Sequence, residues 1–141
     1  MVRMRKFQIL AVVSLILLGV LPAQEKSAPA KFAGTWQATF KGAVFCTLRI
    51  EAGREITGTL SPGRITVNDE GDLTDAEAST PDGTFPILNA KAEGQKLTFE
   101  WKERGDSEVM RFELRLTGKN EAEIRVTRHN DIKPIRLRRA G

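Results

Sequence analysis

Few residues of this chain could act as a nucleophile or a metal ligand. The sequence contains one cysteine, Cys46, and one histidine, His129. A serine or cysteine nucleophile needs a base such as histidine beside it, and His129 lies in the turn-like stretch 128–131. Cys46 stands in an alternating apolar run, which is typical of a small core residue. One cysteine and one histidine also cannot complete a tetrahedral zinc site. We therefore expect a protein without catalytic residues and without a cofactor.

The acidic residues are concentrated in one stretch of the chain. Six carboxylates and no cation lie between positions 69 and 82. When Gly71 takes the place of the invariant glycine of a calcium-binding loop, Asn68, Glu70 and Glu77 fall at oxygen-ligand positions. The first ligand position, two residues before Asn68, holds threonine where aspartate is expected. An acidic hairpin turn is the simpler interpretation, and a calcium site is the alternative hypothesis.

The amino terminus has the three-part pattern of a secretory signal peptide. Residues 1–6 carry three cations, residues 9–21 are mostly apolar, and the small residue Ala23 precedes the polar Gln24. This pattern predicts a helical signal peptide over residues 1–23, cleaved near Ala23, and a periplasmic or secreted mature protein. The apolar run of about 13 residues spans only about 20 Å, against a hydrocarbon core of about 30 Å, so we expect no stable membrane span after cleavage.

The charge of the mature chain does not favour a nucleic-acid partner. Three cations are lost with the signal peptide, so the formal charge falls from +4 to about +1. The basic segment from Arg125 onward contains no Phe or Trp on which bases could stack. We expect its cations to form a solvated outer face.

From Gly34 onward, apolar and polar residues alternate along several short runs. A period of two predicts half-buried β-strands. The clearest runs are 44–50, 97–101, 110–116 and 122–126. Turn residues separate the runs at seven places, which predicts about eight to ten strands joined mainly to their neighbours.

A short chain with this many strands buries its apolar faces by closing on itself. We therefore expect a flexible leader over residues 24–31 and a single all-β domain over residues 32–139. Its architecture is predicted to be an antiparallel up-and-down β-barrel or a closed β-sandwich. An outer-membrane barrel needs longer strands and aromatic girdles, and this chain has no tyrosine.

The segment Gly34-Thr35-Trp36, followed by Ile-Thr-Gly-Thr-Leu at 56–60, resembles the opening strands of calycin barrels, the group that includes lipocalins and avidins. The layout is also similar to small exported β-barrel domains of bacteria. The resemblance implies that Trp36 lies across a closed end of the barrel and that Arg136 or Arg138 packs over its ring. It does not extend to biotin, because the chain lacks the tyrosine and most of the tryptophans of an avidin site.

Two functions fit this architecture. The first is a non-catalytic binding module whose interior takes a small apolar ligand. The second is a structural or interaction domain that contacts another envelope protein and has no small-molecule ligand. The candidate interior residues are Trp36, Phe40, Phe99, Trp101 and Phe112, together with Val44, Leu48, Leu114 and Ile124. Small residues such as Ala38, Ala43 and Ala122 are mixed with them, so both an open and a packed interior are possible. Only the resemblance favours binding.

Overall fold

The computed structural model describes residues 29–78, 81–103, 105, 107–128 and 131–140. The predicted signal peptide, residues 24–28 of the predicted leader and His129 lie outside these residues. Residues 29–31, which the prediction assigned to the leader, belong to a short 3₁₀ helix, η1 (Pro29–Phe32). A second 3₁₀ helix, η2 (Pro81–Gly83), precedes the sixth strand.

Eight strands of the described chain form a closed antiparallel barrel. They are β1 (Gly34–Phe40), β2 (Ala43–Ala52), β3 (Ile56–Ser61), β6 (Phe85–Glu93), β7 (Lys96–Trp101), β8 (Met110–Leu116), β9 (Glu121–Val126) and β10 (Ile135–Arg139). Each barrel strand pairs with the barrel strands before and after it, and β1 pairs with β10 to close the ring. The predicted up-and-down barrel is therefore confirmed.

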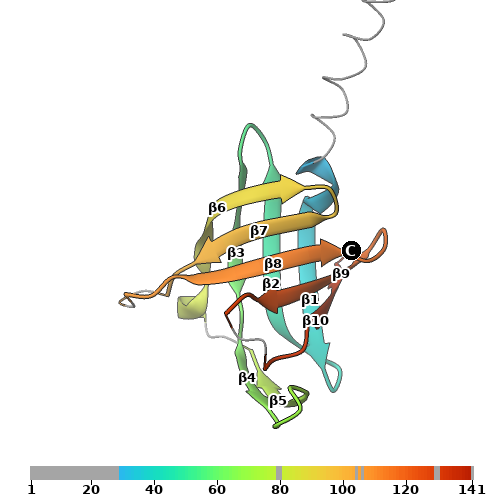
Figure 1. The fold of residues 1–141 in the computed structure, drawn as a ribbon, viewed down its shortest axis with the longest axis vertical. Helices are drawn as coiled ribbons and strands as arrows, with labels where there is room; N and C mark the ends of the chain where they lie inside the picture. The colour runs from blue at the N-terminus through green and yellow to red at the C-terminus, as the bar shows by residue number, and fades with distance from the viewer. Residues whose placement is uncertain (1–28, 79–80, 104, 106, 129–130, 141) are drawn as a thin grey trace, which may run out of the picture.

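Two further strands stand outside the barrel. β4 (Arg64–Val67) and β5 (Leu73–Glu77) form a separate two-stranded hairpin, inserted between β3 and β6. Figure 1 shows this hairpin, in green, at the opposite end of the barrel from the blue η1. The two ends of the barrel are thus covered by different elements.

The core follows the predicted alternation of apolar residues. In β7 every second side chain is buried, and β8 and β9 show the same period. The largest fully buried side chains are Trp36, Phe32, Phe99, Leu48, Leu60, Leu97, Leu114 and Leu137. The Phe99 and Phe112 rings are stacked, with 5.4 Å between their centroids. Each buried side chain of this size contributes about 1.5–3 kcal/mol to stability.

The prediction that Val44 points inward is wrong. Val44 is 40% exposed, whereas its neighbour Phe45 is 3% exposed. The cause is a β-bulge, because Ala38 pairs with Cys46 and Thr39 pairs with Val44, which leaves Phe45 as an extra residue on β2. A bulge moves the residues on one side of it to the other face of the sheet. Ala43, also predicted to point inward, is exposed as well; it is the first residue of β2 and lies beside the turn at 41–42.

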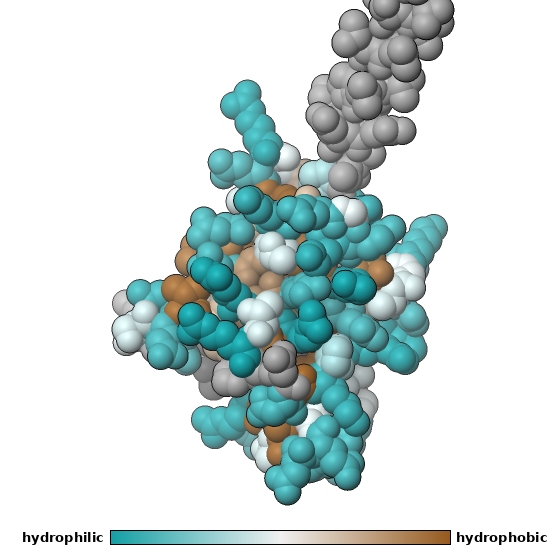
Figure 2. Space-filling view, viewed as in Figure 1, coloured by the Kyte–Doolittle hydropathy of each residue, from teal (hydrophilic) through white to brown (hydrophobic). Residues whose placement is uncertain are grey.

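The outer face of β7 to β9 carries paired charges, as predicted. Glu113 lies opposite Arg125 in the β8–β9 register, and an Arg125 Nη donates a hydrogen bond of 2.9 Å to its carboxylate. Arg115 lies 3.7 Å from the same carboxylate. The hydrogen bond from Arg125, with the nearby charges of Lys96 and Arg115, lowers the pKa of Glu113 below its usual value. Figure 2 shows that hydrophilic side chains cover most of the viewed face.

None of the helices in the described ranges combines the length and the hydropathy needed to cross a lipid bilayer.

Candidate functional site

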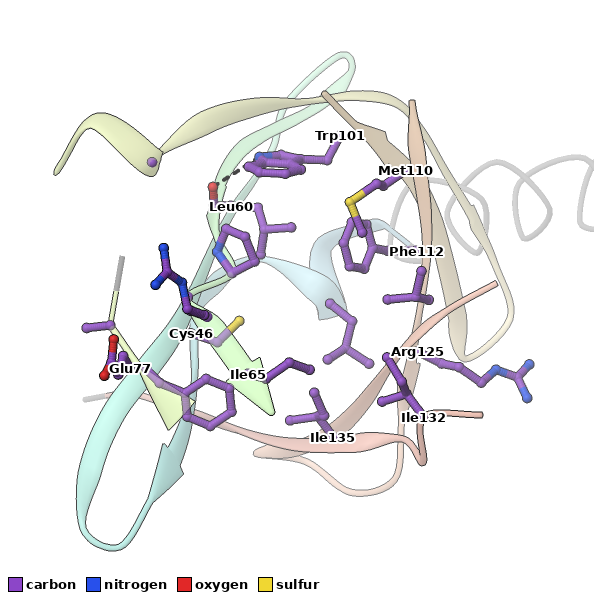
Figure 3. Close-up of a pocket in the computed structure, with 18 of the residues that line it drawn as sticks. Cys46, Leu60, Ile65, Glu77, Trp101, Met110, Phe112, Arg125, Ile132 and Ile135 are labelled. Carbon is purple, nitrogen blue, oxygen red and sulfur yellow. Dashed lines mark hydrogen bonds between the residues drawn. The ribbon is translucent and has the colours of Figure 1, made fainter. Parts of the chain in front are cut away.

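A cavity of about 610 Å³ lies at the barrel end that carries the β4–β5 hairpin. Its lining residues come from the beginnings of β2, β8 and β10 and from the ends of β3, β7 and β9, which meet at one end of an antiparallel barrel. Its larger apolar lining residues are Phe45, Cys46, Leu60, Pro62, Ile65, Trp101, Met110, Phe112, Ile124, Val126, Ile132 and Ile135. Figure 3 shows several of them arranged around this space.

Trp101 forms a fixed aromatic wall of the cavity. Its indole Nε1 donates a hydrogen bond of 3.2 Å to the backbone oxygen of Leu60, which joins β7 to β3 (Figure 3). The Phe85 ring meets the indole edge-on, with 5.7 Å between centroids. The polar atom of Trp101 is therefore satisfied within the protein, and the ring offers its apolar surface to the cavity.

The β4–β5 hairpin covers part of the barrel mouth. Ile65 of β4 lines the cavity, while Leu73 and Ala76 of β5 pack against the hydrophobic core. At the tip of the hairpin, the Lys133 amide donates a hydrogen bond of 3.1 Å to the Gly71 oxygen. The Lys133 ammonium lies 2.8 Å from Oδ1 of Asp72. The tip is thus attached to the β9–β10 loop on the far side of the mouth.

Cys46 lines the cavity but is poorly suited to act as a nucleophile. The residue is 6% exposed, and burial raises the pKa of its thiol from 9.0 to about 12. A thiol becomes nucleophilic mainly as the thiolate, which is scarce near neutral pH at such a pKa. Cys46 therefore contributes apolar surface to the cavity and not a reactive thiol.

Five charged residues form the rim of the cavity, and all five are exposed. They are Arg64, Glu77, Glu103, Arg125 and Lys133. The Arg125 side chain extends away from the cavity toward Glu113 (Figure 3). The polarity of the lining therefore changes from apolar inside the barrel to charged at its mouth.

The opposite end of the barrel is closed by η1 and Trp36. The Trp36 indole Nε1 donates a hydrogen bond of 2.9 Å to the Phe32 oxygen, and both side chains are fully buried. The Arg139 guanidinium lies over the Trp36 ring, 4.3 Å from its centroid. Arg139 also donates hydrogen bonds to the backbone oxygens of Ala33 and Lys31.

The prediction that Arg136 or Arg138 packs over Trp36 is wrong by one residue. Leu137 is buried on β10, and Arg136 and Arg138 on either side of it are exposed. Because side chains alternate along a strand, Arg139 shares the inward face with Leu137. The predicted cation–π contact exists, and Arg139 makes it.

The structure separates the five candidate ligand-binding residues into two groups. Trp101 and Phe112 line the cavity. Trp36 and Phe99 are buried in the barrel core, and Phe40 is half-buried against that core. These three do not line the cavity: Trp36 and Phe99 lie where the barrel interior is packed, and Phe40, the last residue of β1, lies outside the lining.

Sequence reasoning missed most of the apolar residues of the site, among them Phe45, Ile65, Ile132 and Ile135. Phe45 enters through the β2 bulge, which the alternation conceals. Ile65 shares one face of β4 with Val67, a pattern that identifies a strand but does not place it over the barrel mouth. Ile132 and Ile135 lie on either side of Lys133 and Pro134. These two β-branched residues were the signal in the sequence that could have identified an apolar segment here.

The structure does not bring the three calcium candidates together. Asn68 and Glu70 lie in the β4–β5 turn, where Oδ1 of Asn68 accepts the backbone amides of Glu70 and Asp72, both at 3.0 Å. Glu77 lies at the other end of β5, opposite Arg64. Within the described ranges, no three His, Cys, Asp or Glu side chains gather in a way that could hold a metal ion.

No protein-family model matches the chain, and no curated protein or solved structure matches it.

Proposed function

We propose that this protein is an exported, non-catalytic binding module that holds a small apolar ligand in the cavity at the mouth of its barrel. The observation that carries the proposal is the apolar cavity of about 610 Å³. Pockets for small molecules usually measure about 300–1,000 Å³ and have mainly hydrophobic and aromatic linings. Transfer of a ligand from water into this cavity gains about 0.8 kcal/mol for each buried CH₂ group.

A calycin-type barrel is part of the proposal. Its support is the closed end, where a Trp in the first barrel strand packs against an N-terminal 3₁₀ helix and beneath an arginine of the last strand. One closed end and one open end suit a barrel that binds its ligand from a single side.

Export and the absence of catalysis rest on other residues. Export is proposed from the signal-peptide pattern of residues 1–23. A non-catalytic role is supported by Cys46, whose pKa of about 12 leaves the thiol protonated at neutral pH.

The two tryptophans of the chain provide the test, since Trp101 lines the cavity and Trp36 lies in the closed end. In a Trp36→Phe variant, titration with a neutral apolar compound such as dodecanol is expected to change the Trp101 emission. In the matched Trp101→Phe variant, the emission of Trp36 is expected to stay constant. Calorimetry on the unmodified chain gives a reference affinity. Comparison with the affinity of each variant shows whether either substitution changes binding.

A substitution that fills the cavity gives a second check. Ile65→Trp places a large ring in the cavity from the half-buried face of β4, and we expect it to abolish dodecanol binding. Val67→Trp is the matched control, because Val67 lies on the same strand and is not a lining residue. If neither dodecanol nor other apolar compounds bind the unmodified chain, the protein is better explained as an interaction domain with another envelope protein.

A further inference from the structure

The charged rim of the cavity has features that bear on the head group of a ligand. The deepest lining residues, such as Leu60, Trp101 and Phe112, are buried and offer apolar surface. The charged lining residues are all exposed at the mouth. A ligand that fills this space from core to rim must itself change from apolar to polar along its length.

Two of the rim cations are already paired. Arg125 donates a hydrogen bond of 2.9 Å to Glu113, and Lys133 lies 2.8 Å from Asp72. Arg64 and Glu77 differ from them, since neither has an ion-pair partner among the residues that the structure describes. They lie opposite each other in the β4–β5 register, at the base of the hairpin that covers the mouth.

Besides the paired Arg125 and Lys133, the rim therefore presents the cation Arg64 and the anion Glu77 side by side, with Glu103 as a second anion. A guanidinium binds phosphate or carboxylate oxygens, and a carboxylate attracts an ammonium group. A head group with a single charge would be attracted by either Arg64 or Glu77 and repelled by the other. A head group with both charges can pair with both.

We infer that the ligand is a zwitterionic single-chain amphiphile, with its hydrocarbon chain in the cavity and its head group between Arg64 and Glu77. This inference rests on the proposed function, because it requires that the cavity bind a ligand.

The first experiment compares three amphiphiles with the same dodecyl chain, each below its micelle concentration. They are dodecylphosphocholine, dodecanoate and dodecyltrimethylammonium, which carry a zwitterionic, an anionic and a cationic head group. Calorimetry on the unmodified chain is expected to show dodecylphosphocholine binding about two- to fivefold more tightly than either charged compound, the range for one exposed ion pair. Equal affinities, or tighter binding of a singly charged compound, would overturn the inference and leave the proposed function intact.

Charge reversal at the rim tests the two side chains separately. Arg64→Glu is expected to shift preference toward dodecyltrimethylammonium, and Glu77→Arg toward dodecanoate, each by about two- to fivefold. Arg138→Glu is the matched control for Arg64→Glu, because it changes the net charge equally near the closed end, where Arg138 is 71% exposed. If Arg138→Glu shifts the preference as much as Arg64→Glu, net charge and not the rim selects the ligand, and the inference fails. If none of the three compounds nor dodecanol binds, the proposed function itself fails.

Discussion

At the scale of single residues, Arg139 joins the last barrel strand, β10, to η1 and β1. Its guanidinium covers the Trp36 ring and donates hydrogen bonds to the oxygens of Ala33 and Lys31. Backbone oxygens at the end of a 3₁₀ helix need donors, and a guanidinium supplies several in one plane. The Arg139 side chain therefore supplies hydrogen-bond donors to backbone oxygens at the end of η1, and it also covers the Trp36 ring that closes the barrel.

Arg139→Ala should destabilise the protein much more than Arg138→Ala. The first substitution removes the ring contact and the hydrogen bonds to η1, and we expect a loss of about 2–4 kcal/mol in the free energy of unfolding. Arg138 is exposed and lies 3.8 Å from Glu121, so its loss should cost less than about 1 kcal/mol. Urea unfolding of both variants measures the difference. Equal losses would mean that Arg139 is not a structural part of the closed end.

Glu113 gives the outer face a pH dependence of known sign. Its pKa is lowered in the folded protein, first by the hydrogen bond from Arg125. The ionised carboxylate therefore stabilises the fold at pH values above its unfolded pKa, and this contribution is lost as the pH falls through the folded pKa.

Glu113→Gln should lower the free energy of unfolding by about 0.5–1 kcal/mol at neutral pH. The difference from the unmodified chain should shrink as the pH falls below the unfolded pKa of about 4.3, and it should vanish only below the lowered folded pKa, where the carboxyl group is protonated in both states. Urea unfolding across this pH range is the measurement. A difference that stays constant with pH would assign the loss to packing and not to the charge. Glu121→Gln is the control, with a smaller expected effect because Glu121 is more exposed and farther from its arginine.

At the scale of elements, the β4–β5 hairpin depends on a glycine at its tip. Gly71 has φ of +85° and is buried, and a Cβ there would lie 2.3 Å from the Asp131 oxygen. The close contact places the Gly71 oxygen within reach of the Lys133 amide. An alanine at this position must push the hairpin tip away from the β9–β10 loop.

Gly71→Ala should therefore speed both association and dissociation of an apolar ligand, with a smaller change in Kd. Gly42→Ala is the matched control, because Gly42 has nearly the same φ, +83°, but a Cβ there meets no atom within 4 Å. Both variants carry the backbone strain of about 1–2 kcal/mol, and only Gly71→Ala displaces the hairpin tip. Stopped-flow measurement of Trp101 emission with dodecanol gives the two rates. Equal rates in the two variants would show that the hairpin tip does not limit access to the cavity.

At the scale of the whole molecule, the barrel could be predicted from the sequence and the cavity could not. Alternation in runs such as 110–116 and 122–126, with turn residues between runs, requires a sheet that closes. The positions of Val44 and Phe45 depend on a bulge, which arises from pairing with β1 and leaves no periodic signal. Residues 64–67 and 73–77 have the pattern of two more barrel strands, so their placement across the mouth is a tertiary effect.

The asymmetry of the two barrel ends leads to a prediction for the protein as it is made in its own cell. The closed end is packed around Trp36, and the other end holds about 610 Å³ lined with apolar side chains. Such a surface is costly to hydrate, so a matching ligand should stay bound through gentle purification. Native mass spectrometry is expected to show a reproducible extra mass of a few hundred daltons, about the size of a ligand for such a pocket. The same measurement should place the mature amino terminus at Gln24.

The Ile65→Trp protein should lack the extra mass, and the Val67→Trp protein should retain it. An extra mass that persists in Ile65→Trp would assign the ligand to a different site, whereas a bare mass in all three proteins would favour a protein partner over a small molecule.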